Sequence, residues 1–201
     1  MNHYNLLCLG DSYTVGESIP LYRSLPYQTV LQLRKKDFLF SAPEIVAKTG
    51  WTTDELDEAL KGYRFLNKYD FVSLMIGVNN QYRGHDVIQY KEELEILIKK
   101  AIELANGKKD HVILISIPDY SHTPFAASME TAKIAKDIDV FNTVGRALSI
   151  QYKIQYLDIT SESREGRGDS KMIAEDGLHP SPKAYEKWSE KLTALIAAQL
   201  K

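Results

Sequence analysis

Three residues of this sequence, Ser12, Asp176 and His179, are of the types that nucleophilic catalysis requires. A serine hydroxyl is a poor nucleophile until an imidazole accepts its proton. The imidazole in turn needs a carboxylate that fixes its tautomer and stabilises its charged form. Asp176 and His179 lie three residues apart in a turn that contains Gly177, so one short loop can orient both. We therefore predict Ser12 as the nucleophile, His179 as its base and Asp176 as the support of that base.

A serine nucleophile also requires hydrogen-bond donors, because its attack on a carbonyl group creates a tetrahedral oxyanion. The backbone N–H groups of Ser12 and Gly50 and the side-chain amide of Asn79 are the candidate donors. Each of these residues also fits an ordinary structural role: serine caps helices, glycine ends strands and asparagine caps turns. Their catalytic assignment depends on whether the fold brings them together.

Short apolar runs alternate with longer stretches of helical periodicity along the whole chain. The runs predict strands at residues 6–9, 44–47, 71–76, 112–117 and 154–157. The periodic stretches predict helices at 26–36, 52–60, 86–104 and 129–152, and a last helix that begins at Ser181-Pro182. In the first of these helices Tyr27, Val30, Leu31 and Leu33 are expected to face inward. After the fifth strand, residues 161–171 are expected to form a polar loop.

This alternation is typical of parallel strands joined by right-handed crossovers. We therefore predict a single domain over residues 1–201 with a doubly wound, mainly parallel α/β sheet of about five strands. The expected architecture has three layers, α/β/α, with a flavodoxin-like strand order. In such a sheet ligands bind beyond the carboxyl ends of the strands. Ser12, Gly50 and Asn79 each follow a predicted strand, and Asp176 and His179 precede the last helix, so all five are expected at that rim.

At these residues the chain resembles the SGNH hydrolases, also called GDSL-type esterases and lipases. The Gly-Asp-Ser block of that family corresponds to residues 10–12, its Gly-x-Asn block to residues 77–79 and its Asp-x-x-His-Pro block to residues 176–180. The resemblance implies the catalytic roles given above, an oxyanion hole of Ser12, Gly50 and Asn79, and no metal or organic cofactor. The blocks occur in order and span nearly the whole chain.

Two positions depart from the pattern of that family. Tyr13 stands where the family usually has leucine, which is expected to change the packing behind the nucleophile or the wall of the pocket. Asn80 replaces the usual aspartate after the oxyanion-hole asparagine, so any role for a carboxylate there is in doubt. A second Gly-Asp-Ser, at residues 168–170, is expected to be unrelated to catalysis because no strand precedes it.

Composition sets limits on the partners of the protein. The net charge of -2 provides no basic surface for nucleic acid, and no apolar run is long enough to span a bilayer. No signal peptide follows Met1 and the single cysteine, Cys8, cannot form an internal disulfide, so we expect a cytoplasmic protein. The expected partner is a small-molecule ester. The sequence makes no prediction about oligomeric state.

Several functions stay open at this level. The loops near the predicted rim contain Trp51, residues 81–83 and residues 119–122, which are polar or aromatic rather than aliphatic, and this favours a short acyl group such as acetyl on a polar, carbohydrate-like alcohol. An acyltransferase, a thioesterase or a lysophospholipase would use the same catalytic residues. From another class, a flavodoxin-like module could bind FMN or phosphate at residues 12–16, although Asp11 would then place a negative charge beside the phosphate.

Overall fold

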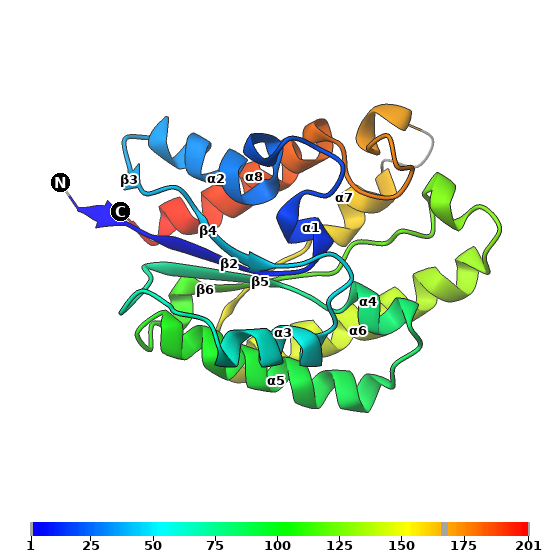
Figure 1. Cartoon of the computed structure of the whole chain (residues 1–201), viewed down its shortest axis with the longest axis horizontal. Helices are drawn as coiled ribbons and strands as arrows, with labels where there is room; N and C mark the ends of the chain where they lie inside the picture. The colour runs from blue at the N-terminus through cyan, green and yellow to red at the C-terminus, as the bar shows by residue number, and fades with distance from the viewer. Residues whose placement is uncertain (1, 166–168, 201) are drawn as a thin grey trace.

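The computed structural model describes residues 2–165 and 169–200, which form a parallel sheet with helices on both faces (Figure 1). The strands are β1 (His3–Tyr4), β2 (Leu6–Gly10), β3 (Leu39–Phe40), β4 (Glu44–Ala47), β5 (Phe71–Met75), β6 (Val112–Ile115) and β7 (Gln155–Leu157). The α-helices are α1 (Ser12–Val15), α2 (Leu25–Arg34), α3 (Thr53–Lys61), α4 (Val78–Tyr82), α5 (Val87–Leu104), α6 (Thr131–Tyr152), α7 (Thr160–Glu165) and α8 (Pro182–Ala198). Short 3₁₀ helices cover Leu21–Arg23, Lys109–His111, Pro124–Ala126 and Ser170–Met172.

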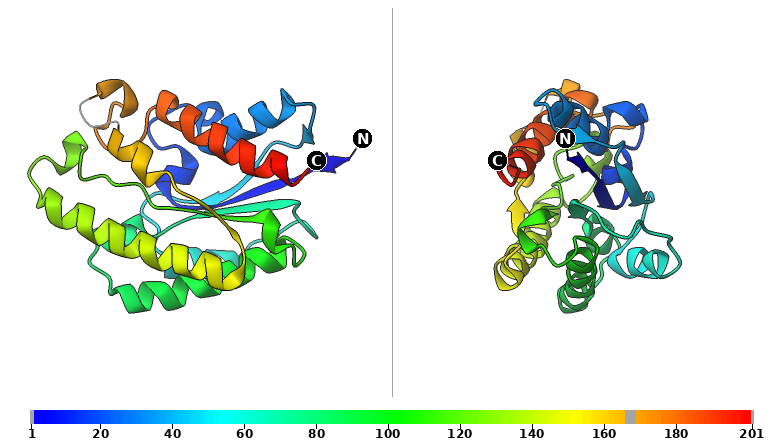
Figure 2. Two further views of the ribbon diagram at one scale, coloured as in Figure 1. Left: turned by 180° about the vertical axis from the view of Figure 1, so that it is seen from behind. Right: turned by 90° about the vertical axis from the view of Figure 1, so that its left-hand side faces the viewer.

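The main sheet has five parallel strands in the order β4-β2-β5-β6-β7. In order along the chain this is 2-1-3-4-5, so the predicted flavodoxin-like fold class is confirmed. Every residue of β2, β5 and β6 is buried, as expected of central strands that are covered on both faces. Helices α2 and α8 pack together on one face, while α3, α5 and α6 cover the other (Figures 1 and 2).

The helix boundaries follow the signals in the sequence. Asp86 caps α5 by accepting hydrogen bonds from two backbone N–H groups of the first turn. Thr52 and Glu55 form a capping box at the start of α3. Ser181 accepts from the backbone N–H of Ala184 and caps α8, with Pro182 as its first residue. These three caps confirm the predicted helix starts.

The structure corrects the sequence prediction in three places. His3–Tyr4 and Leu39–Phe40 pair as a separate two-stranded parallel sheet that the sequence did not indicate. Part of the expected polar loop at 161–171 is helical, because α7 covers Thr160–Glu165. Leu31 was expected to face inward, but it is 51% exposed, whereas Val30 and Leu33 are buried.

Within residues 2–165 and 169–200, no helix has both the length and the apolar character needed to cross a membrane.

Candidate active site

Ser12 lies at the turn between the central strand β2 and the short helix α1. Asp11 caps this helix, and its side chain accepts a hydrogen bond of 3.0 Å from the backbone N–H of Tyr13. The turn requires glycine at position 10, because a Cβ there would lie 2.2 Å from Thr14 Oγ1 and 2.4 Å from the carbonyl oxygen of Met75. The Gly-Asp-Ser sequence therefore builds the tight turn that presents the serine hydroxyl at the carboxyl edge of the sheet.

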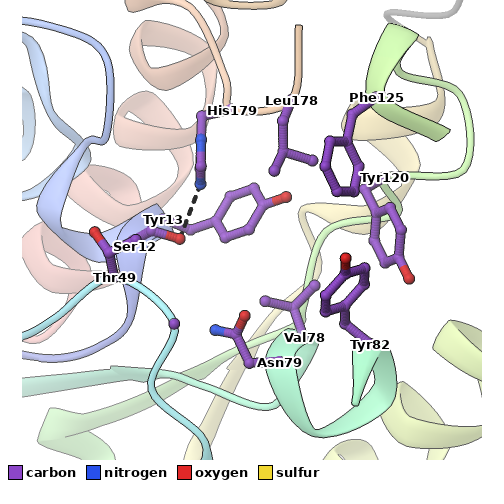
Figure 3. A pocket seen from close by; sticks show the side chains of 11 residues that line it. Ser12, Tyr13, Thr49, Val78, Asn79, Tyr82, Tyr120, Phe125, Leu178 and His179 are labelled. Carbon is purple, nitrogen blue, oxygen red and sulfur yellow. Dashed lines mark hydrogen bonds between the residues drawn. The ribbon is translucent and has the colours of Figure 1, made fainter. Parts of the chain in front are cut away.

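The hydroxyl of Ser12 lies against the imidazole of His179, although 167 residues separate the two in sequence (Figure 3). The distance from Ser12 Oγ to His179 Nε2 is 2.9 Å, and His179 Nδ1 lies 2.6 Å from Asp176 Oδ2. Because a carboxylate only accepts hydrogen bonds, Nδ1 carries the proton and Nε2 is free to accept the proton of the serine. Ser12 and His179 are both buried, at 4% and 6% exposure.

A compact turn holds Asp176 and His179 in this arrangement. The backbone N–H of Ala174 donates to the carbonyl oxygen of His179, and Ile173 pairs with Pro180 in an antiparallel bridge. Gly177 completes the turn with a φ of 72°, in the left-handed region that favours glycine. Asp176 Oδ1 accepts the backbone N–H groups of Leu178 and His179, at 2.9 and 3.0 Å.

The same contacts determine the charge of Asp176. Partial burial alone would raise the pKa of this carboxyl group, but the hydrogen bonds from the His179 imidazole, two backbone N–H groups and the Ser18 hydroxyl outweigh it. The net effect is a pKa well below the ordinary value of 3.8. Asp176 is therefore a carboxylate at neutral pH, which is the form that can stabilise a protonated imidazole.

The three predicted oxyanion donors border one cavity with the nucleophile. Ser12, Gly50 and Asn79 all line it, together with His179 (Figure 3). One N–H of the Asn79 side chain donates to the carbonyl oxygen of Trp51 at 3.0 Å, which fixes the amide plane. Gly50 has a φ of 85°, a left-handed conformation that turns its peptide group away from the strand direction. Arg83 holds this loop by donating to the carbonyl oxygen of Gly50 at 2.6 Å.

The rest of the cavity wall is mostly apolar. The cavity has a volume of about 140 Å³, and besides the residues above it is lined by Tyr13, Thr49, Val78, Tyr82, Tyr120, Phe125 and Leu178 (Figure 3). The rings of Tyr82, Tyr120 and Phe125 pack against one another with centroids 5.9 to 6.4 Å apart. Sequence reasoning named Tyr13 as a residue of the pocket wall and placed Tyr82 and Tyr120 in loops at the rim, but it missed the other wall residues as functional candidates.

Most of the polar side chains expected at the rim have other partners. Gln81 is buried and accepts a hydrogen bond from the Tyr120 hydroxyl at 2.9 Å. Asp119 is buried and forms an ion pair with Arg164 at 2.8 Å. Arg83 pairs with Glu55 at 3.0 Å. The loop composition therefore overstated the polarity of the site, because these groups support the loops rather than line the cavity.

The two departures from the family pattern have defined contacts. The ring of Tyr13 is buried, lies 5.0 Å from the His179 ring between centroids, and forms part of the cavity wall. Asn80 is fully buried, and its side chain accepts from the backbone N–H of Thr53 at 3.1 Å and donates to the Thr53 hydroxyl at 2.6 Å. Asn80 therefore joins α4 to the start of α3, a neutral role that an amide performs without a buried charge.

Asp11 is the other unusual carboxyl group beside the nucleophile. It is 1% exposed, and burial raises its pKa from 3.8 to about 7, although the backbone N–H of Tyr13 opposes the shift. Its Oδ2 lies 3.5 Å from the Asn79 amide nitrogen, a weak contact. Of the second Gly-Asp-Ser, residue 168 and the side chain of Ser170 lie outside the described part of the structure.

One family model and several solved structures match this chain. A model of the GDSL-like lipase/acylhydrolase family matches residues 8–187. Among solved structures, TesA has a TM-score of 0.77 and 20% sequence identity, and the match covers 96% of this chain and 98% of TesA. A lipase/acylhydrolase from Enterococcus faecalis has a TM-score of 0.77 at 19% identity, and the match covers 99% of this chain and 97% of the lipase/acylhydrolase.

A third similar structure is Axe2, an acetylxylan esterase from Geobacillus stearothermophilus, with a TM-score of 0.74, 19% identity, and 96% and 94% of the two chains covered. At such identities the structural likeness establishes the fold. A search of curated protein sequences gave no significant match. The family model covers most of the 201-residue chain, so the protein belongs to the GDSL-like lipase/acylhydrolase family, the SGNH serine hydrolases that act on ester bonds.

Proposed function

We propose that the protein hydrolyses carboxylic esters through an acyl-enzyme on Ser12. The observation that supports this most directly is the continuous chain of contacts from Ser12 Oγ through the His179 imidazole to Asp176, at 2.9 and 2.6 Å. His179 Nε2 accepts the serine proton while Oγ bonds to the carbonyl carbon of the ester. The imidazolium then returns this proton to the departing alcohol as the carbon–oxygen bond breaks, and Asp176 stays ionised throughout.

The second half of the reaction uses the same groups. His179 accepts a proton from water, the resulting hydroxide bonds to the acyl carbon, and the proton returns to Ser12 Oγ as the acid leaves. In both halves the negative charge on the carbonyl oxygen is stabilised by the backbone N–H groups of Ser12 and Gly50 and by the second N–H of the Asn79 amide. The contact of Asn79 with the Trp51 carbonyl oxygen supports this role, because it fixes the amide plane before substrate binds.

We further propose that the acyl group is short. The cavity of about 140 Å³ is close to the ~150 Å³ of an engineered cavity that binds benzene, so an acyl chain of about six carbons fills it. Each methylene contributes about 0.8 kcal/mol only while it is removed from water. Binding energy should therefore stop rising beyond a hexanoyl group, and acetyl is the first group to test. The fold shared with an acetylxylan esterase makes acetylated xylan a reasonable ester of a polar alcohol to include among the substrates.

Labelling with a fluorophosphonate tests the nucleophile. Ser12→Ala should lose both the label and ester hydrolysis while its circular dichroism spectrum stays native, because only the reacting oxygen is removed. Ser170→Ala, which alters the other Gly-Asp-Ser, is the matched control and should label like the wild type. A folded Ser12→Ala protein that still labels would refute the proposal.

A series of p-nitrophenyl esters from acetyl to palmitoyl tests the acyl preference. We expect kcat/KM to reach its maximum at or below six carbons and to fall for longer chains. Phe125→Ala removes a ring from the wall and should move the maximum to longer chains, since it enlarges the cavity. A steady rise of kcat/KM into the long-chain range would instead indicate a lipase or thioesterase.

A further inference from the structure

Ser18 donates a hydrogen bond of 2.7 Å to Oδ2 of Asp176, from 158 residues away in the sequence. The same carboxylate oxygen lies 2.6 Å from His179 Nδ1. Ser18 is therefore in direct contact with the chain of groups that ends at the nucleophile. No motif in the sequence indicates this contact, because Ser18 lies six residues beyond the Gly-Asp-Ser block.

The backbone of Ser18 is held in an uncommon conformation to make this contact. Its φ is 61°, in the left-handed region, which is unfavourable for residues other than glycine, asparagine and aspartate. Helix α1 ends at Val15, and its C-cap residue Gly16 also has a left-handed φ of 82°. These turns reverse the chain after α1. Strained residues of this kind gather at functional sites, where the surrounding structure must hold them in place.

We propose that Ser18 is a positioning residue for catalysis, which locks the Asp176 carboxylate in the orientation that His179 requires. This inference rests on the catalytic roles proposed above for Asp176 and His179. Ser18 does not line the cavity, so it acts through Asp176 and not on the substrate.

The contacts of Asp176 explain why the Ser18 hydroxyl matters. Two backbone N–H groups of its own turn hold Oδ1, whereas among residues 2–165 and 169–200 the hydrogen-bond partners of Oδ2 are Ser18 and His179 alone. The side chain of Asp176 is 27% exposed, so water can reach it if the serine donor is lost. The carboxylate would then be free to rotate, and the imidazole would lose its fixed tautomer for part of the time.

The Ser18 hydroxyl also draws negative charge away from Oδ2. Without it, more negative charge stays on Oδ2, and the electrostatic attraction between the carboxylate and a protonated imidazole becomes stronger. Other ionisable groups near this site include Asp11, Tyr13, Glu17, Tyr82, Tyr120 and Tyr185, and the variants below leave all of them in place.

Two substitutions of Ser18 separate catalysis from backbone strain. Ser18→Gly removes the hydroxyl and relieves the left-handed strain, so it should keep or raise the melting temperature. In Ser18→Asn, the asparagine tolerates the same φ and restores a hydrogen-bond donor, although on a longer side chain. Asp37→Gly is the control, because Asp37 has a similar φ of 65° in the turn before β3, outside the proposed site.

We expect Ser18→Gly to lower kcat roughly three- to tenfold with KM unchanged, as for loss of one partly exposed charge-assisted hydrogen bond. The acid limb of its kcat/KM profile should move to higher pH, Ser18→Asn should recover most of the lost kcat, and Asp37→Gly should match the wild type. A Ser18→Gly enzyme with wild-type kcat and an unshifted profile would overturn the inference. That result would leave the proposed function intact, since Ser12→Ala tests it separately.

Discussion

Asn79 is the proposed oxyanion donor whose contribution can be measured by one side-chain truncation. Its amide is fixed by the Trp51 carbonyl oxygen at 3.0 Å, and its other contact, with Asp11 Oδ2 at 3.5 Å, is weak enough for a substrate oxygen to replace. We expect Asn79→Ala to lower kcat by about 10²–10³, the usual effect of losing one such donor. Steady-state kinetics on p-nitrophenyl acetate measures this, with circular dichroism as the check on folding. A kcat within about threefold of wild type would exclude the donor role, because this change is smaller than the about 1.4 kcal/mol that a tenfold change in rate represents.

Asp11 makes the stability of the protein depend on pH. Its pKa is about 7 in the folded protein and 3.8 is its ordinary value, so the folded protein binds this proton more tightly than the unfolded chain does. The stabilising contribution of the group is complete below about pH 4 and is lost as the pH rises to about 7.

Asp11→Asn keeps a side-chain acceptor for the cap of α1 but cannot ionise. Relative to wild type, its free energy of unfolding should therefore increase between pH 4 and pH 8, by on the order of a few kcal/mol. Urea denaturation at a series of pH values measures the difference. Glu58→Gln is the control, because that side chain is 78% exposed. A difference for Asp11→Asn that does not change with pH would contradict the prediction.

At the scale of elements, Gly77 fixes the relation between β5 and α4, the helix that carries Asn79. It has a φ of 127°, and a Cβ there would lie 2.5 Å from the ring of Tyr90. Gly77→Ala therefore adds both backbone strain and a steric clash with a buried ring. Gly84→Ala is a matched control, because Gly84 is also left-handed at 71° but has nothing within 4 Å of such a Cβ.

We expect Gly77→Ala to lower the free energy of unfolding by roughly 3–5 kcal/mol, the sum of strain and overpacking, and Gly84→Ala by about 1 kcal/mol. Urea denaturation of both variants measures which of them loses more free energy of unfolding. Equal losses in the two would show that Tyr90 can move away from position 77, and that only the glycine conformation matters.

The elements that the sequence predicted correctly are those whose signals are local. Apolar runs identify the five strands of the main sheet, and caps such as Asp86 and Ser181 identify the helix starts. The prediction that Leu31 faces inward was wrong, because its side chain is on the solvent side of α2. Composition alone does not reveal which side of a helix packs against the core. The pairing of β1 with β3 joins two-residue strands, which are too short to show a period.

The residues of the candidate site also differ in whether the sequence could predict them. The family pattern at Ser12, Asn79, Asp176 and His179 predicts their roles, and the fold places all four together. The aromatic wall and Ser18 could not be predicted, because they depend on contacts between distant loops. Ser18 meets Asp176 across 158 residues, and its left-handed conformation is one that serine rarely adopts.

At the scale of the whole molecule, one segment from the first part of the chain and one from the last part meet at the site. Ser12 follows the first strand of the main sheet, and His179 immediately precedes the last helix, which packs on α2 (Figures 1 and 2). The nucleophile and its base are therefore in contact only when the first and last parts of the chain have both folded. Loss of the α2–α8 packing should separate them even where the central strands stay paired.

The positions of the two tryptophans give the protein an intrinsic optical probe. The carbonyl oxygen of Trp51 holds the Asn79 amide, and Trp188 is 1% exposed and lines a small cavity behind Tyr13 and Leu178. The sequence contains no other tryptophan, so all of its indole fluorescence comes from one residue whose backbone binds Asn79 and one that lines a cavity with Tyr13 and Leu178. Binding of a covalent inhibitor at Ser12 should therefore change the emission without any added label, and Trp51→Phe would show which indole responds.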